Sequence, residues 1–137
     1  MHRVSAEERR ARLVRRHLLV PSDRVESVAE VARALVAVHS TDPATVFLSV
    51  RARSVAPLGP ASIEDELYEQ RTVVRMLGMR RTLFVVPRET RPVVQAACTN
   101  DVAARERAKL AGWLAKARVA DERALLRAAE QAALAAV

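Results

Sequence analysis

The chain has 137 residues, with 23 Lys and Arg against 16 Asp and Glu and a single cysteine, Cys98. This length suits one domain, or one domain and the start of a second, and it folds without disulfides or structural metals. One cysteine makes neither an intramolecular disulfide nor a cysteine-rich zinc site, and no apolar run approaches the roughly 18 residues of a membrane span. We therefore expect a cytoplasmic protein and exclude secreted, membrane-spanning and metal-stabilised classes.

The net charge of +7 favours a polyanionic partner. The charge is segregated along the chain: residues 1–24 carry +4, residues 71–91 carry +5 and residues 61–70 carry −4. A uniformly solvated surface does not require such segregation. The four aromatic residues are too few for a base-stacking platform, which argues against RNA-recognition and oligonucleotide-binding barrel folds.

Two helices are predicted at the start of the chain from capping boxes, in which a serine is followed three residues later by a glutamate. Ser5 opens an arginine-rich helix that ends before Pro21, and Ser27 opens a second helix. The second helix has one apolar face with three- and four-residue spacing. That face comprises Val28, Val31, Ala32, Leu35 and Val38, and His39 extends it.

A third and a fourth helix are predicted next. Asp42 before Pro43 indicates a capping residue and the first position of a helix, which runs to about Arg53. A loop with two prolines and a glycine follows, and Ser62 then opens a short acidic helix over residues 63–70.

The hydrophobic period changes after the acidic helix. Two β-branched and apolar runs, residues 72–77 and 82–86, are separated by a glycine-containing connection at 78–81, which predicts an antiparallel hairpin. The remaining chain is predicted to be helical to Lys116, and Asp121 caps a final alanine-rich helix.

Helices followed by a two-stranded hairpin are typical of a winged helix, which is a helix-turn-helix core with a β-hairpin wing. We predict a mainly α fold with one hairpin, in which residues 1–87 form a winged-helix domain. Residues 88–137 are expected to be a helical segment that starts a second, truncated winged-helix module. The hairpin should project from a three-helix body, and a hairpin lying inside a larger sheet with both tip guanidiniums paired would contradict this picture.

Arginines near the hairpin are the candidate DNA contacts. Arg80 and Arg81 lie at the predicted tip, where forked guanidiniums can follow a groove or bind phosphates. Arg75, within the first strand, is expected to point toward DNA or to pair with Glu69. The further candidates are Arg51 and Arg53, which follow the third helix. For all of these arginines the alternative is a solvated surface.

Several stretches resemble one known family. Residues 35–43 (LVAVHSTDP) with 47–53 (FLSVRAR), and residues 67–71 (LYEQR) with 74–86 (VRMLGMRRTLFVV), are similar to the N-terminal module of the winged-helix DNA-binding superfamily of the AlkZ/YcaQ type. The resemblance covers residues 5–137, about the first third of a typical member. It implies a bacterial DNA-repair protein, which is nucleoid-associated when bound to double-stranded DNA. The characterised members are DNA glycosylases that excise alkylated bases or unhook interstrand crosslinks, without metal or cofactor.

The catalytic triplet of that family, Gln–apolar–Gln or Gln–apolar–Asp, falls on His39, Ser40 and Thr41, none of which matches it. Cleaving an N-glycosidic bond requires a positioned water and stabilisation of a cationic sugar. His39 could accept the proton of that water, Thr41 could hold it, and Asp42 could supply negative charge. The structural alternatives are a core-packed histidine, a turn threonine and a helix cap.

Two other functions remain open. The replaced glutamines favour a non-catalytic winged-helix transcriptional regulator, and the basic surface also suits an interaction module for an acidic partner. The sequence fixes neither the oligomeric state, nor the target lesion or DNA sequence, nor whether the chain is a truncated family member.

Overall fold

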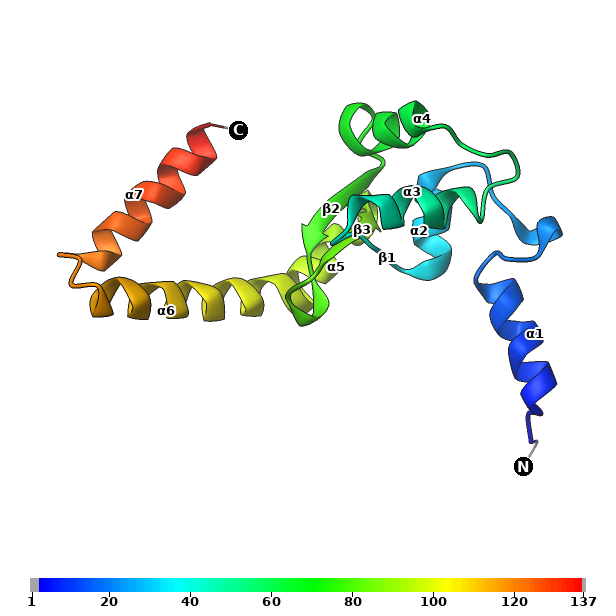
Figure 1. The fold of residues 1–137 in the computed structure, drawn as a ribbon, viewed down its shortest axis with the longest axis horizontal. Coiled ribbons are helices and arrows are strands. Elements are labelled where there is room, and N and C mark those ends of the chain that lie inside the picture. Colours follow the sequence, from blue (N-terminus) through cyan, green and yellow to red (C-terminus); the bar gives the residue numbers. More distant parts are fainter. Residues whose placement is uncertain (1–2, 137) are drawn as a thin grey trace.

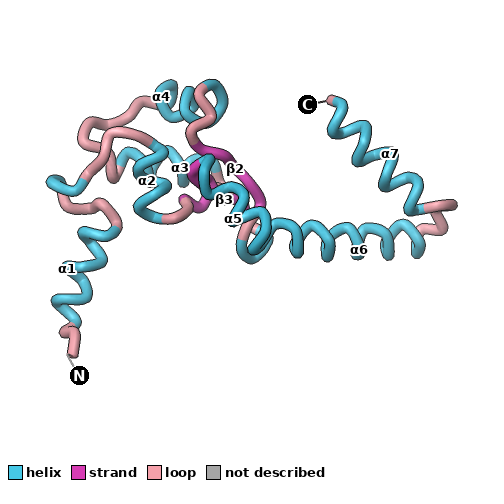
Figure 2. Tube along the Cα trace, turned by 180° about the vertical axis from the view of Figure 1, so that it is seen from behind, coloured by secondary structure: helices cyan, strands magenta, loops and turns pink. Residues whose placement is uncertain are grey.

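The computed structural model describes residues 3–136, and these residues are mostly helical with one small antiparallel sheet (Figure 1). Helix α1 (Ala6–Arg16) projects from one end of a central body. From the other end, α6 (Asn100–Lys116) extends outward and α7 (Glu122–Ala135) turns back from its far end (Figures 1 and 2). The central body comprises α2 (Val28–Leu35), β1 (Val38–His39), α3 (Pro43–Arg51), α4 (Pro60–Glu64), β2 (Val73–Leu77), β3 (Leu83–Pro87) and α5 (Arg91–Val94).

Four helix starts are confirmed by their caps. The side chains of Ser5, Ser27, Asp42 and Asp121 each accept a hydrogen bond from a backbone amide of the first turn, over distances of 2.9–3.2 Å. The predicted start of the acidic helix at Ser62 is wrong. That helix begins at Pro60, because a proline fits the first helical position, where no amide hydrogen is needed.

The expected continuation of the second helix through Val38 and His39 is also wrong. Helix α2 ends at Leu35, and Val36 adopts a left-handed φ of 71° that turns the chain. Val38 and His39 then form the short strand β1, paired with Val85 and Phe84 of β3.

The predicted hairpin is confirmed, but it is part of a larger sheet. The strand order is β1-β3-β2, and both pairs are antiparallel, so β3 is the central strand. Val38, Val73 and Val85 belong to the core cluster that includes residues of α2 and α3. Because period-2 alternation places cross-strand partners on one face, His39 and Phe84 lie on the opposite face. The expected projection of the hairpin from a three-helix body is therefore wrong, because the hairpin is two strands of a three-stranded sheet and β1 anchors it at Phe84 and Val85. Its connection, residues 78–82, lies at the end nearest α6 (Figure 1).

A buried carboxylate ties the acidic segment to α2. The π-helical turn Asp65–Glu69 continues α4, and its Glu66 is buried. The Glu66 carboxylate accepts hydrogen bonds from the amides of Val28 (2.7 Å) and Ala29 (3.1 Å) and from the Thr72 hydroxyl (2.8 Å). It thus supplies acceptors to the free amides at the start of α2 and fixes the entry into β2.

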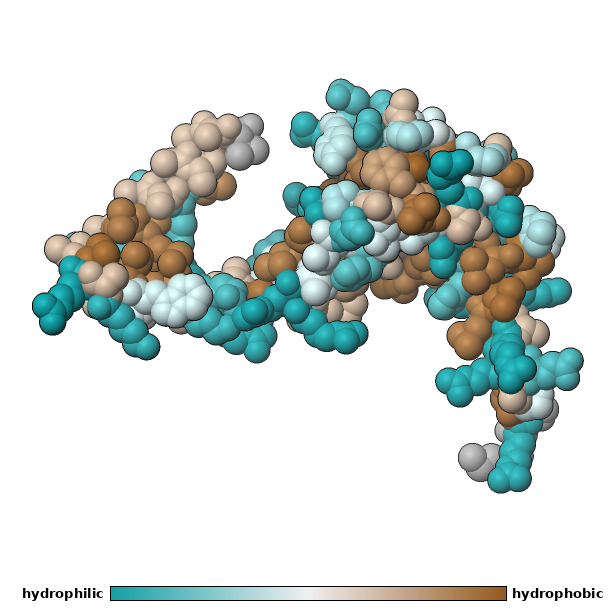
Figure 3. Space-filling model, viewed as in Figure 1, coloured by the Kyte–Doolittle hydropathy of each residue, from teal (hydrophilic) through white to brown (hydrophobic). Residues whose placement is uncertain are grey.

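The C-terminal part is helical to Lys116, as predicted, and contains a second π-helical turn at Gln95–Thr99. Arg107 on α6 pairs with Glu130 on α7 over 2.6 Å. Apolar residues gather where α6 meets α7 (Figure 3), and Trp113 and Leu125 are among the exposed large hydrophobic residues. None of the helices in the described range is long and apolar enough to cross a membrane.

Candidate nucleic-acid interface

His39 and Thr41 are brought together at the end of β1. The His39 ring lies edge-on to Phe84, with the ring centroids 5.4 Å apart. The Thr41 hydroxyl oxygen lies 3.3 Å from His39 Nε2 and accepts a hydrogen bond from the Leu83 amide, also over 3.3 Å. Both side chains are exposed. The two residues singled out from the sequence therefore form one hydrogen-bonded pair on the surface.

Asp42 lies next in the chain and caps α3. Its Oδ1 accepts a hydrogen bond from the Ala44 amide over 3.0 Å, which is the structural role expected of an aspartate before a proline. Its side chain is exposed, and in the sequence its charge directly follows Thr41.

The peptide between His39 and Thr41 is held from β2. Arg75 reaches across the central strand and donates hydrogen bonds from Nε (3.2 Å) and Nη2 (2.8 Å) to the carbonyl oxygen of Ser40. Ser40 is fully buried, and its amide donates to the Leu83 carbonyl over 2.8 Å. The structure does not pair Arg75 with Glu69, and because the Arg75 side chain is also exposed, its contact with DNA stays a prediction. A backbone acceptor 35 residues away leaves no signal in the sequence.

The hairpin tip meets α6, a contact that the sequence did not predict. Arg80 and Arg81 are both exposed and both have left-handed φ angles, of 54° and 60°. Arg81 Nη1 donates to Glu106 Oε1 over 2.8 Å, and Lys109 Nζ donates to the same oxygen over 3.0 Å. These hydrogen bonds, that of Lys109 foremost, lower the pKa of the Glu106 carboxyl. Arg80 has no ion-pair partner among residues 3–136.

The two arginines after α3 have different environments. Arg51 is exposed at the end of the helix. Arg53 is half-buried and donates from Nε to the His17 carbonyl (3.0 Å) and from Nη1 to the Ser49 carbonyl (2.9 Å), and its burial lowers the pKa of the guanidinium. The structure therefore places Arg53 at the joint between α1 and α3.

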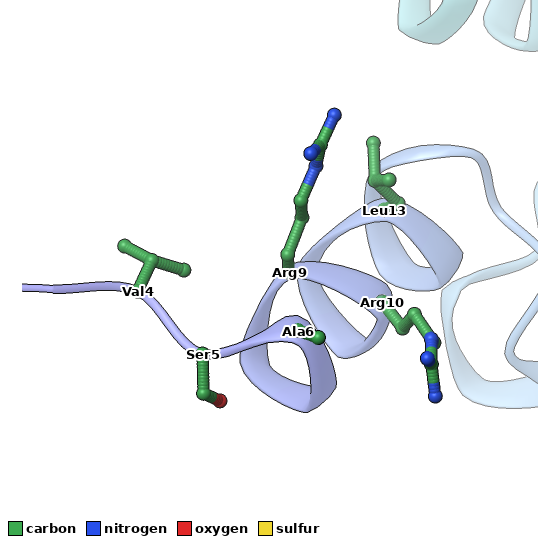
Figure 4. A pocket seen from close by; sticks show the side chains of 6 residues that line it. All are labelled: Val4, Ser5, Ala6, Arg9, Arg10 and Leu13. Atoms are coloured by element: carbon green, nitrogen blue, oxygen red, sulfur yellow. The ribbon is translucent and has the colours of Figure 1, made fainter.

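The start of α1 forms an open hollow lined by arginines, but these do not converge. Arg9 and Leu13 project to one side of the helix, whereas Arg10 projects to another (Figure 4). Within the described range, no three His, Cys, Asp or Glu side chains are grouped as a metal site would require.

A comparison with protein families identifies the relatives of this fold. A family model described as "DNA glycosylase AlkZ-like" matches residues 32–137, which is more than half of the chain. The chain belongs to the AlkZ-like DNA glycosylase family. The resemblance found in the sequence is thereby confirmed, and membership in this family implies DNA as the partner and DNA repair as the setting. The match includes β1, the hairpin, α6 and α7 and begins beyond α1. No curated protein and no solved structure matches the chain.

Proposed function

We propose that the chain binds double-stranded DNA through a winged helix whose body spans residues 28–87. The order of elements supports this proposal: helix, short strand, two helices, then a hairpin that completes a three-stranded antiparallel sheet. In such a fold the third helix is the usual DNA-reading element. Here that helix is α4 with its π-helical turn, which carries Glu64, Asp65 and Glu69. Because these carboxylates repel phosphates, we assign the DNA-facing side to the hairpin instead.

The proposal depends most on one observation, the exposed pair of His39 and Thr41 beside the cationic hairpin tip. Thr41 accepts its hydrogen bond from the amide of Leu83, two residues after Arg81. The pair occupies the triplet position of the AlkZ-like family, and Arg75 holds the intervening peptide in place. Guanidiniums that bind the backbone on either side of a lesion would thus bring the damaged nucleotide to these two side chains.

The enzymatic form of this proposal is hydrolysis of the N-glycosidic bond of an alkylated or crosslinked base. When His39 Nε2 carries no hydrogen, it accepts the hydrogen of the Thr41 hydroxyl. The Thr41 oxygen accepts from the Leu83 amide and can accept a second hydrogen bond from a water. As that water attacks, its proton passes to the Thr41 oxygen while the Thr41 hydrogen passes to His39 Nε2. The water oxygen forms a bond to the sugar carbon, and the electrons of the glycosidic bond leave with the cationic base. Asp42 supplies negative charge beside the developing sugar cation.

The test is an excision assay on duplex DNA that carries a methylated purine, scored by released base and abasic sites. Wild-type protein is expected to release the base, and His39→Ala or Thr41→Val to reduce the rate at least about 100-fold, since general-base catalysis contributes on that order. The matched control is His17→Ala, an exposed histidine after α1. Equal rates for His39→Ala and His17→Ala would contradict the catalytic assignment.

A non-catalytic DNA-binding regulator is the second candidate. The hydrogen bonds of the site residues favour it, because they have structural roles: Thr41 accepts from the Leu83 amide and Asp42 caps α3. The same assay separates the two functions, because a regulator binds the duplex and releases no base.

A further inference from the structure

A basic hollow lies between the hairpin tip and α6. It has a volume of about 350 Å³ and is lined by Arg80, Arg81, Val102, Arg105, Glu106 and Lys109. Four of these side chains are cations and one is a carboxylate. The hollow combines residues more than 20 positions apart in the sequence, because Arg81 contacts Glu106 across 25 residues. The positive charge of residues 71–91 is therefore continued by cations of α6.

The Glu106 carboxylate lies at the centre of this cluster. Its Oε1 accepts hydrogen bonds from both Arg81 and Lys109, at 2.8 and 3.0 Å, and the two cations lower the pKa of Glu106, so that it is charged at neutral pH. Arg105 pairs with Asp101 of the preceding turn, and Arg80 pairs with no carboxylate in the part of the chain that is described. The single internal anion of the hollow leaves it with an excess of positive charge.

These ion pairs are weak enough to be exchanged. The side chains of Arg81, Glu106 and Lys109 are between 40% and 58% exposed, and pairs of this kind contribute at most about 1 kcal/mol. A phosphodiester offers the same cations two acceptor oxygens that share one negative charge, and DNA releases condensed counterions when its phosphates are bound.

We propose that this hollow is a cradle for a backbone phosphate of DNA, in which the Glu106 carboxylate occupies the place of the phosphate while DNA is absent. The inference rests on the proposed DNA binding and adds to it a second contact element, α6, and an internal competitor. Since Glu106 competes with the phosphate, its removal strengthens DNA binding, whereas the loss of a residue that merely orders the site would weaken it.

Glu106→Gln tests this directly, because glutamine keeps the size of the exposed side chain and removes its charge. The matched control is Glu130→Gln, which makes the same change in net charge. Glu130 also pairs with an arginine of α6, Arg107, but that pair joins α6 to α7 and does not line the hollow. Affinity for a fluorescently labelled 20-base-pair duplex is measured by anisotropy between about 50 and 200 mM salt, the range over which phosphate contacts change affinity steeply.

We expect Glu106→Gln to bind at least about threefold more tightly than Glu130→Gln at the lowest salt, because the phosphate no longer has to displace a carboxylate from the hollow. Equal affinities of the two variants, or weaker binding by Glu106→Gln, would overturn the cradle while leaving the proposed DNA binding intact. If neither wild type nor variants bind the duplex, both proposals fail. Adding inorganic phosphate at matched ionic strength should leave the difference in affinity between the two variants unchanged. If that difference disappears, the hollow is a site for free phosphate instead.

Discussion

Ser40 and Ser54 are both buried serines, but within the described residues only Ser54 has a partner for its hydroxyl. Ser54 Oγ donates to the Val50 carbonyl over 2.7 Å, whereas Ser40 Oγ has no hydrogen-bond partner there. An unpaired buried hydroxyl costs about 1–3 kcal/mol, and a paired one contributes about 1 kcal/mol. We therefore expect Ser40→Ala to leave the free energy of unfolding unchanged or raise it by about 1 kcal/mol.

Ser54→Ala is the control for that substitution and should lower the free energy of unfolding by about 1 kcal/mol. Both are measured by urea denaturation followed by circular dichroism. A loss of stability for Ser40→Ala as large as that for Ser54→Ala would show that the Ser40 hydroxyl has a partner in solution.

Residue-level contacts were predictable from sequence only where partners are close in the chain. The caps at Ser27 and Asp42 bond to amides two or three residues away, so a short motif predicts them. Arg75 and Glu66 bond to backbone groups 35 to 38 residues away. The packing of the sheet on α2 brings these groups together in space, and no local sequence pattern encodes that packing.

The first turn of α2 makes stability depend on pH. Glu30 accepts hydrogen bonds from the Ser27 hydroxyl and from the Glu26 and Ser27 amides, and these bonds, that of the hydroxyl first, lower the pKa of Glu30. A folded-state pKa below the unfolded value gives stability that is present above the unfolded pKa and is lost as pH falls through the folded pKa. The contribution should therefore be complete at neutral pH and decline below about pH 4.3, the ordinary glutamate pKa.

The measurement is the free energy of unfolding of wild type and Glu30→Gln between neutral pH and pH 3. Wild type should be more stable at neutral pH by roughly 0.5 kcal/mol, a value discounted because the side chain is exposed, and the difference should shrink in acid. A difference that grows as the pH falls would mean that the charge of Glu30 does not stabilise the cap.

At the scale of elements, the hairpin and most helices follow from the sequence, and β1 does not. The hairpin has two runs long enough to show β-branched enrichment, but β1 is only Val38–His39 and continues the apolar spacing of α2. The helix ends because Val36 takes a left-handed conformation, a backbone choice that its residue type disfavours. The functional consequence is large, since the strand places His39 at the surface, within reach of Thr41.

At the scale of the whole molecule, charge and shape suggest one DNA-facing side. The acidic residues of α4 and its π-helical turn lie on one part of the body, whereas Arg80, Arg81 and the start of α6 lie together at the far end of the hairpin (Figure 1). The long α6 could follow the backbone beyond the hairpin tip. We therefore assign salt-dependent DNA binding to this end of the molecule.

The most direct test of that central claim is the salt dependence of duplex binding by wild type and by the double variant Arg80→Gln/Arg81→Gln. A control double variant, Arg118→Gln/Arg123→Gln, removes two exposed arginines, one just after α6 and one in the first turn of α7, away from the hairpin. We predict a linear fall of log affinity with log salt for wild type, and a slope reduced by about 1.8 in the hairpin variant alone, the value for two phosphates. A slope that is the same in both double variants, or wild-type binding that does not change with salt, would contradict the account.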